Sequence, residues 1–535
     1  MAGGGVIMRV TLLLSALISA PAHADDTATV NTIGMGEELD LVLDGHTRWI
    51  GASHPDFIVD SQANEQGEGT LVGQGFALDH RLRFGAQLVA KEWKLELQGD
   101  LFTGQLAGDT WDLGPWDERR RDAHTALDTS GFVPRNAYLE GMVGNVQLTA
   151  GLVTSDWGLG LLANDGERQP LFGRADLGDR NLRLGLFTAP FKGEGGPQGH
   201  LPLYVGFAAD AVVADDTSRW QDGQGAYNLI GALLWRPSDG KLNAGTYVVY
   251  RYQRERESSR NTSVLVPDAY VDTVLPIGDW NLRLAGEGAV TLGQTSRALS
   301  YNKRDHLALA AGGAALVGEL HAPEDALILH LRSGVASGDR NQDDERSTSF
   351  AFDRNYNVGS VLFDEYMAGI ESGTSKILHD PQYAGQPPDG IEGLTTEGAF
   401  KRAVYVQPAV EGWATKWLNL RAGLVMAWAT SPHNQPFYTV RAGGDPRTHL
   451  DTAPTGRGIG TEIDWAIRID PNQVARLKPR GTSRERTTDM RVVHAKRPLQ
   501  PWFLIQGGHA FISKDLATTG DRQLMLISGQ AQLDW

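Results

Sequence analysis

The feature that most constrains the fold is a strict alternation of apolar and polar residues in short segments along the whole chain. In the last segment, one face carries Met525, Ile527, Gly529, Ala531, Leu533 and Trp535, and mostly polar residues lie opposite. A period of two residues predicts β-strands. Because each segment has about the ~10 residues that a strand needs to cross a bilayer obliquely, we expect an all-β fold, a transmembrane antiparallel up-and-down β-barrel.

Eighteen strands can be placed in this way. They span residues 39–50, 72–90, 93–103, 135–142, 145–154, 180–189, 203–214, 226–236, 242–254, 264–275, 280–292, 305–320, 326–336, 403–413, 418–430, 458–469, 499–511 and 523–535. Short turns follow the even-numbered strands, and long polar loops follow the odd ones. Bacterial outer-membrane barrels have this pattern, with mostly short periplasmic turns and long extracellular loops. Two connections, 190–202 and 470–498, are long where a turn is expected, so sixteen strands stay possible.

The N-terminus has the pattern of a secretory signal. Arg9 precedes an apolar run from Val10 to Ala20, and an Ala-His-Ala site ends at residue 24. We therefore divide the chain into a signal peptide (1–24), a periplasmic segment (25–37) and the barrel (38–535). The expected location is the outer membrane of a Gram-negative cell, and the expected partners are its lipids and the barrel-assembly machinery. Since the formal net charge is -16, general nucleic-acid binding is excluded.

The alternation also predicts which charged side chains face the lumen, because a charge turned toward hydrocarbon at mid-depth costs roughly 2 to 4 kcal/mol. Arg183, Arg283 and Arg421 occupy equivalent places in three Asn-Leu-Arg motifs. The predicted pore-lining set also includes Arg83, Arg251, Arg468, Glu96, Glu287, Glu462 and Asp464. Ion pairs within the wall are one interpretation of these arginines. The other is a constriction that favours anionic solutes.

Two segments resemble known families. Residues 135–166, followed by Asp-Leu-Gly-Asp-Arg, resemble a largely uncharacterised family of outer-membrane proteins of myxobacteria and their relatives. The matching signature residues are Trp157, Gly158, Leu159, Gly160, Asn164 and Gly166, with a shortened downstream element at Gly178, Asp179 and Arg180. More loosely, residues 334–344 are similar to a segment of alginate-export-type porins. Both resemblances imply an outer-membrane barrel of about eighteen strands, and neither implies a substrate.

The largest insertion, 337–402, is too long for a simple hairpin. Its aromatic residues, Phe350, Phe352, Tyr356, Phe363 and Tyr366, predict that part of it packs into the barrel mouth. Its acidic start, 339–345, has the first oxygen spacings of a calcium loop. However, Asp344 and Phe350 stand where that loop needs Gly and Glu. We therefore expect a solvated loop and no metal.

A second insertion, 470–498, is strongly basic. Basic loops are usually solvated. Because strand parity places this one in the periplasm, contact with an anionic polymer, a phosphate headgroup or a periplasmic partner is the alternative.

Local motifs of catalysis are absent from the sequence: it has no G-x-S-x-G, no H-E-x-x-H, no P-loop and no Cys. No cofactor is expected. His80, His306, His330 and His509 lie on predicted strands, and catalytic residues of barrel enzymes come from distant strands. An outer-membrane lipase, protease or lipid-A-modifying enzyme therefore stays open as an alternative.

The favoured hypothesis is a porin, or an export or uptake channel, for small polar solutes or an anionic polymer such as a polysaccharide. A plugged structural barrel and a soluble periplasmic β-protein are further alternatives. Leu533 and Trp535 form the predicted assembly signal at the end of the last strand. The repeated lumen arginines Arg183, Arg283 and Arg421 predict a weak preference for anions.

Overall fold

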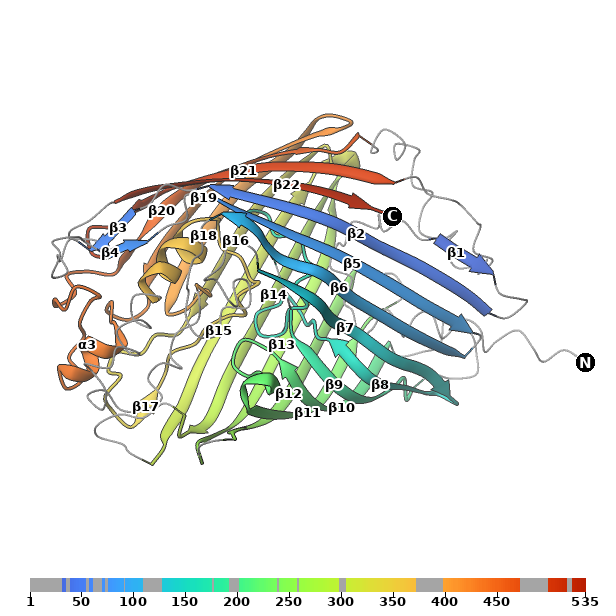
Figure 1. Ribbon diagram of the computed structural model, residues 1–535, viewed down its shortest axis with the longest axis horizontal. Coiled ribbons are helices and arrows are strands. Elements are labelled where there is room, and N and C mark those ends of the chain that lie inside the picture. Colours follow the sequence, from blue (N-terminus) through green and yellow to red (C-terminus); the bar gives the residue numbers. More distant parts are fainter. Residues whose placement is uncertain are drawn as a thin grey trace, which may run out of the picture.

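The strands of the molecule form one closed wall. The computed structural model describes residues 31–34, 39–53, 57–60, 70–72, 76–90, 92–108, 128–175, 178–191, 202–237, 240–256, 259–297, 305–371, 398–471, 499–516 and 522–535. Within these ranges, eighteen strands make the wall of an antiparallel barrel (Figure 1). The predicted fold class and strand number are therefore confirmed.

The wall strands follow the chain order around the barrel. They are β2 (Leu39–Ser53), β5 (Ala77–Ala90), β6 (Trp93–Gly108), β7 (Asp128–Val143), β8 (Val146–Thr154), β9 (Arg180–Thr188), β10 (Leu203–Ala214), β11 (Gln224–Trp235), β12 (Leu242–Glu255), β13 (Asn261–Ile277), β14 (Trp280–Thr295), β15 (Leu307–His321), β16 (Leu327–Ala336), β18 (Ala403–Thr415), β19 (Leu418–Ala429), β20 (Gly458–Ile469), β21 (Gln500–Ile512) and β22 (Gln523–Asp534). Each predicted strand overlaps one of them, because alternation is a local property that survives in the fold.

The barrel closes where the last strand pairs with the first. In this pairing β22 runs antiparallel to β2, from His46 opposite Asp534 to Ser53 opposite Ile527. Beyond the end of β22, the short strand β1 (Asn31–Gly34) pairs with residues 40–43 of β2. Residues 31–34, which the sequence assigned to a periplasmic segment, therefore extend the wall. Residues 1–24, the predicted signal peptide, lie outside the described residues.

Alternation places charged side chains inside and apolar ones outside. On β9, Arg183 is 9% exposed, whereas the next residue, Leu184, is 68% exposed. The same contrast recurs around the wall, and Trp49, Trp93 and Trp417 lie on the outer surface. An apolar outer surface that extends over so many strands is far larger than a soluble protein tolerates. The exterior therefore fits a lipid environment.

The two ends of the barrel differ in their connections. One end, the short-turn end, has two-residue turns such as Gly144–Asn145 and Gly278–Asp279, in which both glycines adopt a positive φ. Such turns match the twist of paired strands. The other, the long-loop end, carries the segments 155–179 and 337–402. The predicted basic segment is described only at residues 470 and 471, so its role stays a prediction.

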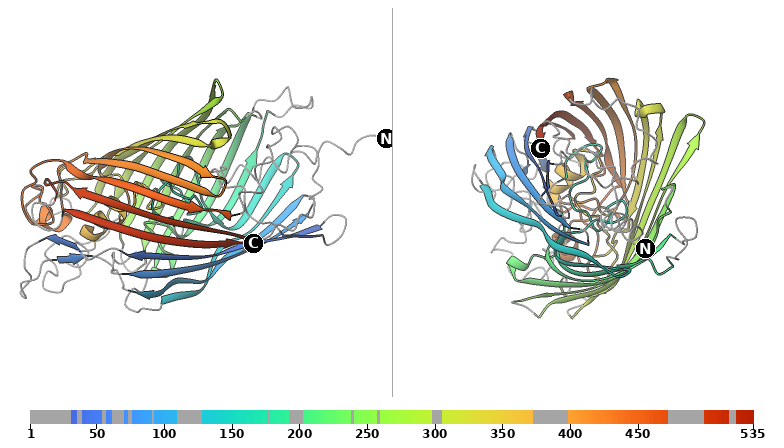
Figure 2. Two further views of the ribbon diagram at one scale, coloured as in Figure 1. Left: turned by 90° about the horizontal axis from the view of Figure 1, so that it is seen from above. Right: turned by 90° about the vertical axis from the view of Figure 1, so that its right-hand side faces the viewer.

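The described parts of both long segments (155–175 and 178–179, 337–371 and 398–402) fold into the barrel, as the right-hand view of Figure 2 shows from the end of the molecule. The 337–402 insertion includes β17 (Arg346–Ser347) and the π-helix η4 (Leu362–Met367). Its residues Phe350, Phe352, Tyr356, Phe363 and Tyr366 are all buried in the largest apolar cluster. The prediction that this insertion packs inside the mouth is therefore confirmed. Shorter elements outside the wall are η2 (Trp220–Asp222), η3 (Pro323–Asp325), α3 (Pro436–Arg441) and the hairpin of β3 (Phe57–Asp60) and β4 (Thr70–Val72). No helix among the described residues is long and apolar enough to cross a membrane.

The alternation fails at Ile459. Strict alternation along residues 458–469 would place Ile459 on the outer face with Ile463, yet it is 2% exposed and lies in the inner cluster. The register of β19 and β20 shifts beside it, where Ala427 pairs with Gly460 and Trp428 pairs with Gly458. A bulge adds one residue to a strand and turns the next side chain to the other face.

Candidate permeation pathway

The 155–179 loop crosses the lumen and is bound first by two wall carboxylates. The Trp157 indole Nε1–H donates to Asp268 Oδ1 at 2.7 Å, and the Leu159 backbone N–H donates to Glu287. Gly158, between them, has a φ of +54°, and a Cβ there would clash with the Glu287 carboxylate. Only glycine fits this approach without strain. The Trp-Gly-Leu-Gly signature therefore attaches the loop to β13 and β14.

The rest of the signature shapes the loop itself. Asn164 Oδ1 accepts from the Gly166 N–H at 2.9 Å, and the Asp179 N–H donates to the Asn164 carbonyl at 3.2 Å. Gly160, at a φ of +83°, lies against the Asn164 side chain. Arg180 begins β9, and its guanidinium reaches the Pro134 carbonyl at 3.5 Å. These contacts hold the two ends of the loop together, so its middle projects inward.

A second attachment is electrostatic and involves Glu167. Its carboxylate bonds to Arg83 and, at 3.3 Å, to Arg135. Arg83 is also bonded to Asp100 through its Nε at 2.6 Å. Burial in the lumen raises the pKa of Glu167, but Arg83 and Arg135 lower it more, to about 2. The Glu167 carboxylate is therefore ionised at neutral pH and binds the loop to β5 and β7.

The third attachment reaches the opposite wall. Phe172 packs in a small apolar cluster with Ala466, Trp502 and Leu504 of β20 and β21. Next to it, the Gln506 side-chain amide donates to the Gly173 carbonyl at 2.9 Å. The 155–179 loop thus spans the lumen from β13 to β21.

The 337–402 insertion is held by another pair of wall carboxylates. Glu462, which is fully buried, accepts the backbone N–H groups of Ser360, Val361 and Leu362 at 2.6, 2.8 and 2.8 Å. The Ser360 hydroxyl donates to Asp464 at 2.5 Å. Leu362 is the first residue of the helical turn η4, Val361 is its N-cap and Ser360 precedes it, and backbone N–H groups at a helix start lack partners within the helix. An anionic acceptor there is favourable.

All ten residues of the predicted pore-lining set point inward, and each has a protein partner. The ion pairs are Arg183 with Asp210, Arg251 with Asp215, Arg283 with Asp272 and Glu319, Arg421 with Glu411, Arg468 with Asp470, and Glu96 with Lys94. Arg83, Glu287, Glu462 and Asp464 bind the inserted loops instead. Of the ten, only Arg183 and Arg251 line the principal cavity. The arginines therefore do not form the ring of free guanidinium groups that the sequence left open.

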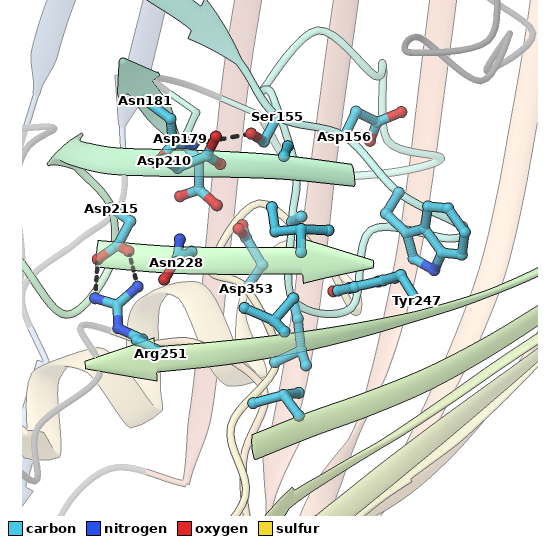
Figure 3. Close-up of a pocket in the computed structure, with 18 of the residues that line it drawn as sticks. Ser155, Asp156, Asp179, Asn181, Asp210, Asp215, Asn228, Tyr247, Arg251 and Asp353 are labelled. Carbon is cyan, nitrogen blue, oxygen red and sulfur yellow. Dashed lines mark hydrogen bonds and ion pairs between the residues drawn. The ribbon is translucent and has the colours of Figure 1, made fainter. Parts of the chain in front are cut away.

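A cavity of about 460 Å³ remains between the inserted loops and the inner surface of β9–β14 (Figure 3). Its lining extends along the strands: on β11 from Asn228 to Leu234 and on to Arg236, and on β12 from Tyr247 to Gln253. It therefore runs from near the long-loop end toward the short-turn end. The sequence did not lead us to Tyr247 as a lining residue of the cavity, although its inward parity on the predicted strand 242–254 was a usable signal. It also missed Asp353, for which the sequence offers no signal.

Charge in the cavity is not balanced at mid-depth. Most of its arginines are paired, for example Arg251 with Asp215 at 2.5 Å and Arg354 with Asp216 at 3.2 Å. Within the described chain, neither Asp179 nor Asp353 forms an ion pair. Burial raises the pKa of both carboxyl groups well above the ordinary range, and the neighbouring carboxylates raise it further. The carboxyl groups at the middle of the cavity therefore lack a compensating cation, and a cation that enters between them would lower their pKa and favour their ionised form.

Neither a metal site nor a hydrolytic triad is evident in the described part of the chain. No group of three metal-ligating side chains occurs there. Near the acidic start of the insertion, Asp339 and Asn341 instead accept backbone N–H groups of their own loop. Of the four candidate histidines, His80 contacts Thr47 and the Phe102 carbonyl, His306 contacts Asp305, His330 lies between Glu319 and Glu411, and His509 stacks on Phe511. None of these four is bonded to a serine.

Comparison with known proteins gives the following results. No family model matches the sequence, and no curated protein matches it. Among solved structures, Pseudomonas aeruginosa OpdK with vanillate is 12% identical over 92% of this chain and 99% of that chain, with a TM-score of 0.47. Pseudomonas aeruginosa OccK2 (OpdF) in complex with glucuronate is 10% identical over 94% of this chain and 97% of that chain, with a TM-score of 0.44. A BenF-like porin from Pseudomonas fluorescens Pf-5 is 9% identical over 94% of this chain and 100% of that chain, with a TM-score of 0.46. The fold assignment rests on the strand pairing above, and the resemblances to the myxobacterial and alginate-export families stay predictions.

Proposed function

We propose that this protein is an outer-membrane channel through which small polar solutes diffuse. The observation that carries the proposal is the cavity along β9–β14, which follows the barrel axis inside a closed wall with an apolar exterior. Charged and strongly polar solutes cross a bilayer rapidly only where a protein shields them from hydrocarbon. A lumen lined by charged and amide side chains provides that shield.

The size of the cavity favours small solutes over an anionic polymer. A volume of about 460 Å³ is typical of sites for small organic molecules. The described parts of the 155–179 loop and of the 337–402 insertion lie in the lumen beside the cavity, each held by a buried carboxylate. We infer that these loops set the size limit of the channel.

Orientation and assembly follow from the same architecture. The long-loop end is assigned to the cell exterior, and the short-turn end to the periplasm, as in other outer-membrane barrels. Leu533 and Trp535 are proposed as the signal for the barrel-assembly machinery, since β22 closes the wall by pairing with both β21 and β2. The basic segment 470–498 is proposed as a periplasmic contact for a partner.

Deletion of residues 525–535 tests this assignment of the last strand. The truncated protein is expected to lose membrane insertion, because β2 and β21 would both have unpaired edges. Heat-modifiable migration on gels and membrane fractionation measure insertion. Normal insertion of the truncated protein would contradict the proposed signal.

A plugged structural barrel is the second candidate, and the extensive attachment of the inserted loops is the observation that favours it. Planar-bilayer recording of the purified barrel in KCl separates the two. A steady conductance that rises in proportion to salt concentration is expected for a channel. Zero conductance from correctly folded protein would overturn the proposed function in favour of the plug.

An enzyme is not favoured, since the candidate histidines have no serine partner. Lipase, protease and lipid-A-modifying assays on the same preparation test that alternative.

A further inference from the structure

The inner wall beside the cavity carries an aliphatic row at mid-depth. Ile230 pairs with Val249, and Val249 pairs with Val266, so three inward-facing side chains on β11, β12 and β13 are direct neighbours. All three line the cavity. The next row toward the long-loop end is polar, with Asp210 beside Asn228 and Asn228 beside Arg251. An aliphatic row that faces a polar lumen is stabilised when a solute with an apolar body covers it.

A tyrosine hydroxyl marks the next row toward the short-turn end. Tyr247 is only 7% exposed, and its ring packs edge-to-face on Trp157 with 4.6 Å between ring centroids. Its hydroxyl has no hydrogen-bond partner among the described residues, yet the residue lines the cavity. Figure 3 shows this hydroxyl aimed into the cavity. Buried tyrosine hydroxyls usually have a partner, so this one is available to a solute.

Two carboxylates from the inserted loops face the same region. Asp353 is 4% exposed, and its Oδ1 accepts the Asn355 N–H at 2.8 Å, which fixes its orientation. In Figure 3 the Asp353 carboxylate points toward the group of Asp179 and Asp210. Asp210 is neutralised by Arg183, whereas Asp179 and Asp353 form no ion pair in the described chain. Arg251, whose charge acts on Asp179, is bonded to Asp215.

We propose that this middle section is a binding subsite for small organic amines with an apolar body. The ammonium group lies between Asp179 and Asp353, and the apolar body covers Ile230, Val249 and Val266. The Tyr247 hydroxyl donates a hydrogen bond to an acceptor on the solute, directly or through a water molecule. The proposal deepens the proposed channel function and rests on it.

The test compares three probes of nearly equal size: benzylammonium, benzyl alcohol and benzoate. Each is added at neutral pH to single channels that conduct KCl, and the concentration that halves the current is measured. Benzylammonium is expected to block at about tenfold lower concentration than the other two, since close charge pairs in a confined lumen are weakly screened. Block by benzoate at an equal or lower concentration would overturn the proposal while leaving the channel function intact.

Substitutions then assign the two parts of the subsite. Asp353→Asn keeps the shape and the bond from the Asn355 N–H, and it should remove most of the benzylammonium preference. Val249→Thr keeps the shape of the aliphatic row but adds a hydroxyl, and it should weaken benzylammonium and benzyl alcohol alike. Asp445→Asn, an exposed loop position between β19 and β20, is the matched control and should change neither. Unchanged block in Asp353→Asn would overturn the assignment.

If the barrel shows no conductance, the proposed channel function is wrong, but the subsite can still be tested. Titration of the same three probes onto the folded barrel in detergent, followed by calorimetry, still tests the subsite. Binding of benzylammonium that Asp353→Asn abolishes would support the subsite without transport. Equal binding of all three probes would overturn it.

Discussion

The two sides of the lumen use the same residue types in different ways. On the side of β5, β20 and β21, wall charges bind inserted loops: Arg83 bonds to Glu167, and Glu462 accepts three backbone N–H groups. On the side of β9 and β10, Arg183 bonds to Asp210, its direct neighbour across the strands. The first side is filled, and the second borders the cavity. Arg183 is thus neutralised within the wall and holds no inserted loop, whereas Arg83 and Glu462 each hold one.

The filled side also shows how loops so long are kept in one position. The 155–179 loop has three attachments on different strands, and the insertion adds an aromatic cluster around Phe400. The polar attachments fix the direction of each loop, because a buried carboxylate without hydrogen-bond donors would destabilise the fold. Apolar packing then supplies most of the stabilisation. Substitutions on the filled side should therefore change the conductance of the channel. Substitutions on the open side, which is the side of β9 and β10 that borders the cavity, should change its ion selectivity.

The largest expected effect comes from the carboxylate that holds the insertion. Glu462→Gln keeps the side-chain size but removes the charge that three N–H groups share, at a cost of about 2–4 kcal/mol. The insertion should detach and the KCl conductance should rise severalfold. Single-channel recording measures this. Asp445→Asn is again the control, and a Glu462→Gln conductance equal to wild type would show that the insertion does not narrow the channel.

A smaller effect is expected at the electrostatic attachment of the 155–179 loop. Glu167→Gln loses the ion pairs with Arg83 and Arg135, but Trp157 and Phe172 still hold the loop. The Glu167 side chain is 41% exposed, so water weakens the pair. We expect about a twofold rise in conductance with frequent switching between two levels. A change as large as that of Glu462→Gln would mean that the loop has no independent apolar attachment.

The smallest effect concerns ion selectivity on the open side. Arg183→Gln leaves Asp210 uncompensated at the cavity, so the reversal potential in a KCl gradient should shift toward cations. Arg283→Gln and Arg421→Gln are matched substitutions at positions that do not line the cavity, and they should shift it less. Equal shifts in all three variants would show that current flows through the whole lumen. The sequence predicted a weak preference for anions from these three arginines. The structure does not favour that preference, because each of the three is already paired.

The wall was predictable from sequence because alternation, turn length and strand length are local properties. Arg183 and Glu287 lie on the inner face of their strands, and the parity rule fails where a strand is irregular, as at Ile459. The pathway was not predictable, since it depends on contacts between distant parts of the chain: Leu159 with Glu287 and Ser360 with Glu462 are each more than 100 residues apart. Parity gives the face of a side chain, but depth along the axis and the choice of partner are set by the loops.

The seam between the first and last strands is completed by a segment from outside the predicted barrel. On one edge of β2, residues 46–53 pair with β22, and residues 40–43 pair with β1. Without β1, the backbone N–H and C=O groups of that second stretch would face lipid, where each unsatisfied group costs several kcal/mol. Residues 31–34 therefore act as a seal on the seam, and the barrel closes fully only when the chain upstream of β2 is in place.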